Sequence, residues 1–355
     1  MRIVHVDSAR GWRGGQNQVL LTAKGMARRG HEIVVACRAG SSLRDRARAA
    51  GLEVEEVAFG GDFVPGPVFA LRALARRFRA DVVHVHDPHA AAAALWLGSP
   101  PTRLIASRRV DFALRGPLSR WKYRRCRRVI AVSRAVARVL ERDGLPAPSL
   151  RVVYEGVPDR APAGGGPDAL RALGVPAGVP VVGNVAALTG HKDHATLLAA
   201  AARVIAQVPE ARFVIVGQGE LEGRLRMQAQ ALGLEGRVVF AGFRPDVDAL
   251  IPAFDVFCLS SHMEGLGTSL LDAMCYGRAV VGTAAGGIPE AVEDGVTGRV
   301  VPPRQPDALA AALTEVLTDG ARREAMGQAG RARFLARFTA DRMVDETLAV
   351  YAEAA

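Results

Sequence analysis

Short apolar runs alternate with segments of helical periodicity along most of this chain. Six strands are predicted in the first half: Arg2–Val6, Glu32–Cys37, Val54–Ala58, Val82–His86, Arg103–Ser107 and Val129–Val132. A helix over Gln16–Arg29 joins the first two. Apolar strands that alternate with amphipathic helices are typical of α/β folds with parallel sheets.

The second half repeats this alternation. Its predicted strands are Val179–Val185, Arg212–Val216, Val238–Ala241, Val256–Leu259 and Ala279–Gly282. The predicted helices among them are Thr196–Val208, Leu221–Leu232, Pro245–Ile251, Thr268–Met274 and Asp307–Leu317. Residues 161–178 are rich in Pro, Gly and Ala, which is typical of a linker with room for one helical turn. We therefore predict two doubly wound domains, residues 1–160 and 179–338, joined by a linker over 161–178.

Composition places the chain among ordinary globular proteins. With 355 residues it is longer than one core usually supports, which agrees with two domains. Its hydrophobic content is 49%, and no run of 18 or more apolar residues predicts a membrane span. The first residues enter a strand pattern without a secretion signal, so we expect a cytoplasmic protein. Four scattered cysteines without a Cys-x-x-Cys pair predict neither a disulfide framework nor a zinc site.

Charge is distributed unequally between the two halves. Residues 1–160 contain 29 Lys and Arg against 14 Asp and Glu, whereas residues 161–355 contain 17 against 22. Two kinds of anionic partner fit the excess of basic residues in the first half equally well. One is the anionic inner face of the cell membrane, and the other is nucleic acid. The basic stretch Arg103–Arg142 has few aromatic residues, so we expect no nucleic-acid partner. A solvated Arg-rich surface is the remaining interpretation.

The segment SHMEGLGTSLLDAM carries the strongest chemical signal in the sequence. Glu264 falls in a loop, and Asp272 lies eight positions later on the second turn of the predicted helix. Gly265, Gly267 and Thr268 leave open backbone N–H groups at the helix N-terminus, which is an arrangement that binds anions. Each carboxylate can bind a hydroxylated group beside a bound phosphate. A phosphate flanked by two polyols describes a nucleotide sugar.

This segment, with the Gly-Gly-Ile-Pro-Glu run that follows at 286–290, resembles the Glu-x7-Glu signature of retaining glycosyltransferase family 4. In that family the first acid contacts the donor sugar and the second acid holds the ribose. The second acid here is Asp272, which is one methylene shorter, so we expect a longer or rearranged ribose contact. The resemblance implies the GT-B fold, with two Rossmann-like domains facing a cleft and a last helix, residues 339–355, crossing back to the first domain.

A second matching loop follows the strand at Val179–Val185. The family has a Gly-Arg-Leu-x-x-x-Lys loop at this point, whose two cations contact the donor diphosphate. Lys192 matches the family Lys, whereas Ala187 stands where the family has Arg. Either one cation suffices, or His191, His194 or an Arg of the first domain compensates. Taken alone, a single Lys in a loop is usually solvated.

Two histidines, His84 and His86, lie at strand spacing near the end of a predicted strand. The family resemblance indicates His86 as a contact of the donor sugar, and we interpret His84 as a plain buried histidine. A metal site that also uses Asp87 and His89 is the alternative. We expect no metal, because the enzymes that this chain resembles are metal-independent.

Glycine-rich loops complete the pattern. Gly14 and Gly15 open the first helix where the family has a Gly-Gly loop near the donor phosphates. Gly217 and Gly219 match the Gly-x-Gly loop that borders the nucleotide. No Gly-x-Gly-x-x-Gly fingerprint follows the first strand of either half, which disfavours dinucleotide oxidoreductases. Asp246 and Asp248 form an Asp-x-Asp pattern, which is the metal motif of a different glycosyltransferase fold. Here the pattern begins a predicted helix, and we interpret the two acids as residues of its first turn that complement the helix dipole.

The resemblance therefore predicts a retaining glycosyltransferase without metal or other cofactor. The predicted catalytic residues are His86, Lys192 and Glu264. The predicted donor-binding residues are Gly14, Gly15, Gly217, Gly219, Gly265, Leu266, Gly267, Thr268 and Asp272. The expected donor is a nucleotide sugar of the UDP or GDP type, and the expected acceptor is a glycan or lipid-linked hydroxyl in cell-envelope or lipopolysaccharide synthesis. A sugar-nucleotide epimerase of the same fold and a non-catalytic polyanion-binding protein are the alternatives.

Overall fold

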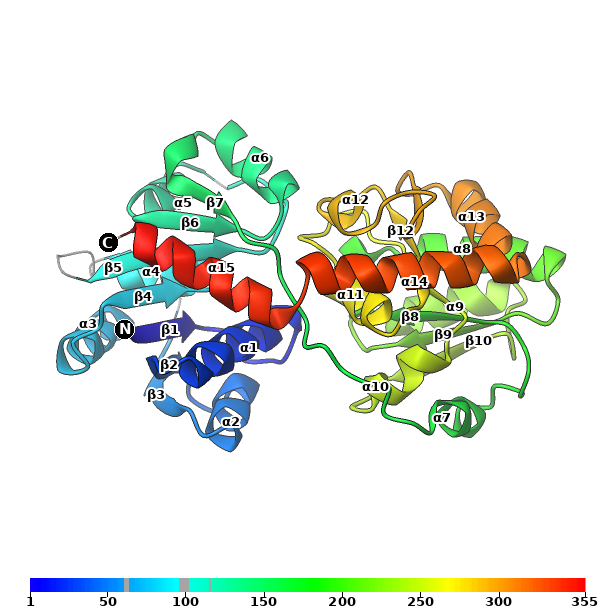
Figure 1. Cartoon of the computed structure of the whole chain (residues 1–355), viewed down its shortest axis with the longest axis horizontal. Coiled ribbons are helices and arrows are strands. Elements are labelled where there is room, and N and C mark those ends of the chain that lie inside the picture. The colour runs from blue at the N-terminus through cyan, green and yellow to red at the C-terminus, as the bar shows by residue number, and fades with distance from the viewer. Residues whose placement is uncertain (61–63, 96–101, 115, 355) are drawn as a thin grey trace. The chain divides into compact units, whose positions relative to one another are not determined.

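The computed structural model describes residues 1–60, 64–95, 102–114 and 116–354 (Figure 1). These divide into two compact units: unit 1 comprises Met1–Gly156 and Ala340–Ala355, and unit 2 comprises Val157–Thr339. The last residue of the predicted C-terminal helix, Ala355, lies outside the described residues. In both units a parallel sheet is covered by helices, which confirms the predicted α/β class.

Unit 1 is built on a seven-stranded sheet with the order β3-β2-β1-β4-β5-β6-β7, in which all neighbours are parallel. The strands are β1 (Arg2–Asp7), β2 (Glu32–Arg38), β3 (Glu53–Val57), β4 (Val82–Val85), β5 (Arg103–Arg108), β6 (Arg128–Ala131) and β7 (Leu150–Val152). The strand order reverses between β1 and β4. Ligands of open α/β sheets bind beyond the carboxyl ends of the strands at such a reversal.

Helices cover both faces of this sheet. They are α1 (Gly14–Arg28), α2 (Ser42–Ala49), α3 (Pro65–Arg77), α4 (Pro88–Ala94), α5 (Gly116–Arg124), α6 (Arg134–Arg142) and α15 (Ala340–Glu353). The C-terminal helix α15 packs beside α1 (Figure 1) and adds Val344 and Tyr351 to the core on that face. This close packing requires glycine at position 25 of α1, because a Cβ there would collide with the Val344 side chain.

Unit 2 has a six-stranded parallel sheet with the order β10-β9-β8-β11-β12-β13, which reverses between β8 and β11. Its strands are β8 (Val181–Val185), β9 (Arg212–Val216), β10 (Val238–Gly242), β11 (Val256–Leu259), β12 (Ala279–Thr283) and β13 (Gly298–Val301). Its helices are α7 (Gly166–Ala172), α8 (His194–Gln207), α9 (Glu222–Ala231), α10 (Val247–Leu250), α11 (Thr268–Cys275), α12 (Ile288–Ala291), α13 (Pro306–Thr318) and α14 (Gly320–Arg337). One continuous core joins the sheet to α8, α9 and α13.

Several elements differ from the sequence expectations. The short strands β7 and β13 were not predicted, because an Arg interrupts each apolar run (LRV and GRVV). The long helix α14 was also not predicted, since small and basic residues weaken its apolar stripe. The segment 161–178 carries the two-turn helix α7 and belongs to unit 2. Strand β4 ends at Val85, so His86 is the first residue beyond it.

Candidate active site

The loops that leave β8 and β11 bring Lys192 and Glu264 together at the strand-order reversal of unit 2. Lys192 lies in the 3-10 turn Gly190–Lys192 after β8, and Glu264 lies in the loop after β11. The Lys192 Nζ group forms an ion pair with the Glu264 carboxylate, and Ser261 Oγ donates a hydrogen bond of 3.1 Å to the same carboxylate. The two charged side chains are 17% and 13% exposed, so a ligand can still reach them.

Backbone contacts fix the position of these loops. Asp193 adopts a left-handed conformation (φ 49°, ψ 48°), and its side chain caps α8. Asp accepts this conformation more readily than most residues, and it turns the chain directly after Lys192. Ser260 Oγ donates to the Lys192 carbonyl at 3.0 Å, and the His262 N–H donates to the His191 carbonyl at 2.9 Å. The loop after β11 is therefore joined to the loop after β8 on both sides of Lys192.

Helix α11 begins next to Glu264. Gly267 precedes it in a left-handed conformation (φ 91°), and no side chain caps its N-terminus. Gly265 and Leu266 are buried, whereas Thr268 is half-buried. Uncapped N–H groups and the helix dipole together favour an anion at this end of α11.

Asp272 lies further along α11 in a separate charged network. Its carboxylate is 2.6 Å from Arg160 Nη2, while Arg160 Nη1 is 2.7 Å from Asp248. The hydroxyl of Tyr276 donates to Asp248 at 3.0 Å. Burial raises the pKa of Asp272 to about 7, and the adjacent Arg160 guanidinium acts in the opposite direction. The side chain retains 23% exposure, so Asp272 is accessible to a ligand.

Sequence reasoning missed Arg160. It stands 112 positions before Asp272, in a Pro- and Ala-rich segment without a recognisable motif. Asp248, the second acid of the Asp-x-Asp pattern, accepts from Arg160 at the start of α10, and Asp246 accepts from Arg244 at 2.6 Å. Both acids of that pattern are therefore used in ion pairs within the described part of unit 2.

The Gly-x-Gly loop after β9 packs against the loop after β8. A Cβ at Gly217 would collide with the carbonyl oxygen of Ala186, and one at Gly219 would collide with that of Leu188. The Leu188 N–H also donates to the Gln218 carbonyl at 3.1 Å. The two glycines thus permit close contact between backbones, which holds the Lys192 loop from the side opposite β11.

His194 does not supply a second cation in place of the family Arg. Its Nε2 lies 3.1 Å from Asn184 Oδ1, and the side chain is buried. Burial, with a smaller contribution from the positive charge of Lys192, lowers the pKa of His194 to about 4. The ring is therefore neutral at physiological pH and serves to join α8 to β8. His191 is exposed and lies 3.2 Å from the Thr189 hydroxyl.

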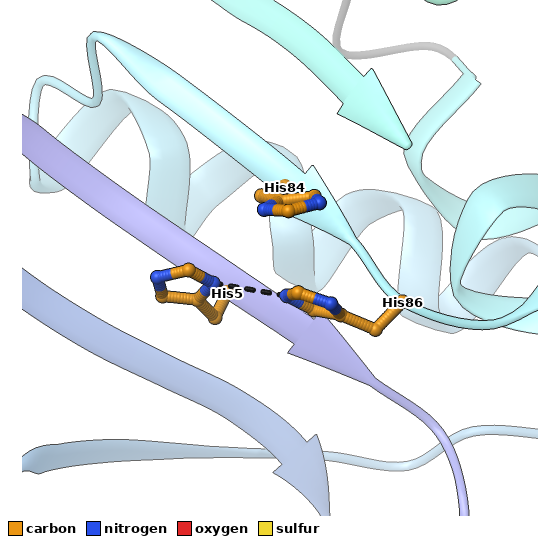
Figure 2. A group of neighbouring side chains, drawn as sticks. All are labelled: His5, His84 and His86. Atoms are coloured by element: carbon orange, nitrogen blue, oxygen red, sulfur yellow. Dashed lines mark hydrogen bonds between the residues drawn. The ribbon is translucent and has the colours of Figure 1, made fainter. Parts of the chain in front are cut away.

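In unit 1, His86 lies at the reversal between β1 and β4. Its Nδ1 is 3.1 Å from Arg109 Nη1, and its Nε2 is 2.9 Å from His5 Nδ1 (Figure 2). His84 lies 2.5 Å from the Tyr351 hydroxyl and 2.7 Å from Ser107 Oγ. Burial, together with the charge of Arg109, lowers the pKa of His5 to about 3 and holds those of His84 and His86 well below the usual range. All three rings are therefore neutral.

Asp87 does not join these histidines in a metal site. Its carboxylate accepts from the backbone of α4 and from Ser8 Oγ at 2.6 Å. Gly14 and Gly15 begin α1, and the open side of Gly15 faces the Arg109 side chain. Arg109 is also 3.0 Å from Glu155, so its guanidinium is held between His86 and a carboxylate.

The basic stretch of unit 1 exposes charged and apolar groups side by side. Arg120, Arg124 and Arg125 are exposed on and after α5, and Leu118 and Trp121 keep 48% and 41% of their surface exposed. In the part of the chain that the structure describes, no helix is both long and apolar enough to cross a membrane.

Solved structures with the same fold are GT-B glycosyltransferases. Anabaena HepE, whose crystal structure contains UDP and glucose, is 24% identical and superposes with a TM-score of 0.87 over 99% of this chain and 100% of its own. WaaG, a glycosyltransferase involved in lipopolysaccharide biosynthesis, is 16% identical with a TM-score of 0.74 over 98% and 99% of the two chains. The fold thus defines a GT-B protein.

Sequence comparison then identifies the family. Residues 168–333 match the family described as glycosyl transferases group 1, and residues 12–160 match glycosyltransferase family 4. The 2-deoxystreptamine N-acetyl-D-glucosaminyltransferase of Streptomyces fradiae is 31% identical over 92% of this chain and 88% of its own length. The lipopolysaccharide core biosynthesis glycosyltransferase LpsE of Rhizobium meliloti is 31% identical over 51% of this chain and 52% of its own. This chain belongs to glycosyltransferase family 4 and is a glycosyltransferase.

Proposed function

We propose that this glycosyltransferase is retaining and metal-independent, and that it transfers a hexose-type sugar from a UDP or GDP sugar to a hydroxyl of a glycan or lipid-linked acceptor. The observation that carries the proposal is the Lys192–Glu264 contact beside the uncapped start of α11, with Asp272 eight positions further on. A cation, an anion-binding helix end and two acids at one strand-order reversal suit a diphosphate flanked by two polyols.

In this proposal Lys192 and the amides at Gly267 and Thr268 bind the diphosphate. Glu264 holds hydroxyls of the transferred sugar, and Asp272 holds the ribose. Gly265 and Leu266 contribute backbone contacts, because neither extends a side chain toward solvent. Gly217 and Gly219 keep the neighbouring loop close enough to border the nucleotide. Unit 1 contributes His86 to the donor sugar and the Gly14–Gly15 amides to the phosphates.

The chemistry requires stabilisation of a diphosphate leaving group. The bond between the anomeric carbon and the phosphate oxygen breaks while the acceptor oxygen forms a bond on the same face of the sugar. The acceptor proton passes to the departing phosphate. Lys192 and the N-terminus of α11 stabilise the charge that develops on the leaving oxygen, which is the role a metal has in other transferases. Retention is tested by NMR of the product: inversion at the anomeric carbon would contradict it.

Relatives support the donor type. HepE has been crystallised with UDP-glucose, and a Corynebacterium glutamicum relative, 35% identical over 45% of this chain, is a GDP-mannose-dependent mannosyltransferase. Several relatives are named for lipopolysaccharide, colanic acid or other polysaccharide synthesis. We therefore propose a place in cell-envelope polysaccharide or lipopolysaccharide synthesis.

The deciding experiment is calorimetric binding of UDP, GDP, ADP and CMP in EDTA, with wild type and Asp272→Ala. We expect one nucleotide diphosphate to bind without metal and to lose affinity in the variant. Binding that requires Mg²⁺ would contradict metal independence, and binding indifferent to Asp272 would contradict the ribose assignment. Incubation of the matching donor sugar with acceptors then separates transfer from epimerisation, since an epimerase would return an isomerised nucleotide sugar.

Unit 1 offers features suited to an anionic acceptor. A hollow of about 440 Å³ beyond the carboxyl ends of β2 and β3 is lined by Arg10, Arg38 and Phe59, among others. Two guanidinium groups and an aromatic ring suit a phosphorylated or acidic glycan. The acceptor is therefore proposed to bind on this unit.

The exposed surface at α5 further supports a cytoplasmic enzyme that works at the inner face of the cell membrane. Each basic residue near anionic lipid contributes about 1 kcal/mol, and exposed Trp and Leu side chains enter the interface. We expect Arg120→Glu/Arg125→Glu to reduce binding to phosphatidylglycerol vesicles by at least tenfold in a flotation assay. Arg72→Glu/Arg76→Glu, two exposed residues of α3, is the charge-matched control. Equal loss in both variants, or no loss, would contradict a surface specific to α5.

A further inference from the structure

Three buried histidines meet in the core of unit 1. His5 of β1 is the register partner of His84 of β4, and His86 follows β4 directly. One nitrogen of each ring lies within 4.8 Å of one nitrogen of the others (Figure 2). Three neutral imidazoles at this spacing can either bind a metal ion or form a hydrogen-bonded chain.

The contacts favour the hydrogen-bonded chain. Both nitrogens of His84 are already in contact with hydroxyls, those of Tyr351 and Ser107. A permanent cation, Arg109, lies 3.1 Å from His86 Nδ1. A metal ion would have to displace these hydrogen bonds and accept a positive neighbour in a medium of low dielectric constant, where like charges repel strongly.

Arg109 fixes the tautomer of His86. A guanidinium carries only hydrogen-bond donors, so His86 Nδ1 must accept from Arg109 Nη1. A neutral imidazole that accepts at Nδ1 carries its proton on Nε2. That Nε2–H points at His5 Nδ1, 2.9 Å away, and donates to it.

The same reasoning fixes His5. Because its Nδ1 accepts, its own proton is on Nε2. His5 Nε2 is buried and has no hydrogen-bond partner among the described residues. The His5 side chain is fully buried on β1, so a buried N–H is left unsatisfied at a core position where an apolar residue would leave none. The hydrogen bond from His86 to His5 Nδ1 offsets part of this cost.

We propose that His5 is a positioning residue for His86: by accepting the Nε2 proton, it keeps Nδ1 of His86 as a hydrogen-bond acceptor. Nδ1 faces Arg109, whose side chain is 14% exposed and is also held by Glu155. A sugar hydroxyl that donates to Nδ1 can replace Arg109 there, and Arg109 keeps its carboxylate partner. The catalytic consequence rests on the proposed function of His86, whereas the tautomer does not.

The tautomer is tested by long-range 15N NMR of protein labelled with 15N-histidine, since protonated and unprotonated ring nitrogens have distinct shifts. His86→Gln and His5→Asn assign the two resonance pairs. We expect both rings to carry the proton on Nε2 and to show no titration between pH 6 and 8. A His86 ring protonated on Nδ1 overturns the proposal. So does stoichiometric metal in the purified protein together with metal-shifted resonances of the three rings.

Kinetics test the positioning role. His5→Val removes the acceptor, whereas the side-chain oxygen of Asn in His5→Asn occupies nearly the position of Nδ1 and can accept in its place. We expect His5→Val to lower kcat about tenfold or more with little change in donor KM, and His5→Asn to restore most of the loss. His84→Asn, a change at an equally buried neighbour, is expected to leave the His86 tautomer unchanged.

The outcomes separate the two levels of the proposal. Equal kcat in wild type and His5→Val, with the tautomer as expected, overturns the positioning role. If His5→Val does not fold, the tautomer in wild type and the kcat of His5→Asn still decide, because an inactive but folded His5→Asn contradicts the role. Failure of wild type to transfer sugar from any nucleotide donor refutes the proposed function and leaves the NMR result intact.

Discussion

At the scale of single residues, Glu264 and Asp272 lie only eight positions apart but have different environments. Glu264 is paired with Lys192, whereas Asp272 is paired with Arg160 and is close to Asp248. Asp272, the shorter acid at the position where the family has Glu, is therefore paired with Arg160. Arg160 holds one of its oxygens, which orients the other.

Removal of the Lys192 charge should weaken diphosphate binding selectively. A hydrogen bond to a charged group contributes about 1.5–3 kcal/mol, so Lys192→Ala should lower the affinity for the cognate nucleotide diphosphate by about 10- to 150-fold. Affinity for the nucleoside without phosphate should not change. Lys24→Ala, at an exposed Lys of α1, is the control. Calorimetry measures both, and an equal loss for the nucleoside would mean that Lys192 acts through the fold.

The raised pKa of Asp272 predicts a pH dependence. With a pKa of about 7, the carboxylate is mostly protonated at pH 6 and mostly ionised at pH 8. Ribose hydroxyls donate better to the ionised form, so nucleoside affinity should rise up to about tenfold over this range. Asp272→Asn should show no rise. A nucleoside is used because it has no phosphate groups that could titrate or bind. A rise retained in the variant would contradict the assignment.

The same shift has an opposite effect on folding. The pKa of Asp272 is raised relative to the unfolded chain, so its contribution to stability is greatest below the unfolded value of 3.8 and is lost as pH rises through about 7. Asp272→Asn should therefore increase the free energy of unfolding of unit 2, relative to wild type, more at pH 8 than at pH 5. Urea denaturation at the two pH values measures this difference.

At the scale of elements, two loops and one helix end form the donor side of the site. The loop after β8 is held by the glycine loop after β9 on one side and by the loop after β11 on the other. The backbone at Lys192 is thus placed by hydrogen bonds and packing contacts of uncharged groups. Glycines 217 and 219 function as packing residues in this arrangement.

Gly217→Ala should destabilise unit 2 because its Cβ would collide with the Ala186 carbonyl and its φ of 143° disfavours side chains. We expect a loss of about 2 kcal/mol or more in the free energy of unfolding, and weaker nucleotide binding. Gly223→Ala, in α9 with open space around it, should instead stabilise by about 0.5–1 kcal/mol. Equal stability of the two variants in urea would show that the loops can separate.

At the scale of the whole molecule, the C-terminal helix completes the first unit. Tyr351 of α15 is fully buried and contacts His84, which is 267 positions away. Residues at the two ends of the chain therefore share one core, while Val157–Thr339 folds around another.

Tyr351→Ala should destabilise unit 1 by about 3–5 kcal/mol, as is usual for a large buried aromatic ring. Tyr351→Phe keeps the ring and should lose only about 1–2 kcal/mol with the hydrogen bond to His84. Thermal unfolding should show one transition lowered and the other unchanged, with nucleotide binding by unit 2 retained. A simultaneous shift of both transitions would mean that the units unfold together.

The sequence by itself determined the class of fold and the family. Apolar periodicity identifies the long strands. The Glu-x7-Asp segment and the loop that carries Lys192 each resemble the family through residues that are close together within that segment. Periodicity failed for β7, β13 and α14, where Arg or small residues interrupt the apolar pattern. Local pattern is sufficient where a contact is made within one element or between neighbouring loops.

Only the tertiary structure decided which groups meet across long separations. Arg160 reaches Asp272 over 112 positions, and His5 reaches His86 over 81. Periodicity shows that His5 and His84 lie on strands. It does not show that β1 lies beside β4, or that the Arg109 side chain contacts His86. The order of strands in a sheet and the burial that shifts a pKa both depend on packing between distant segments. They therefore cannot be derived from the local pattern of a single sequence.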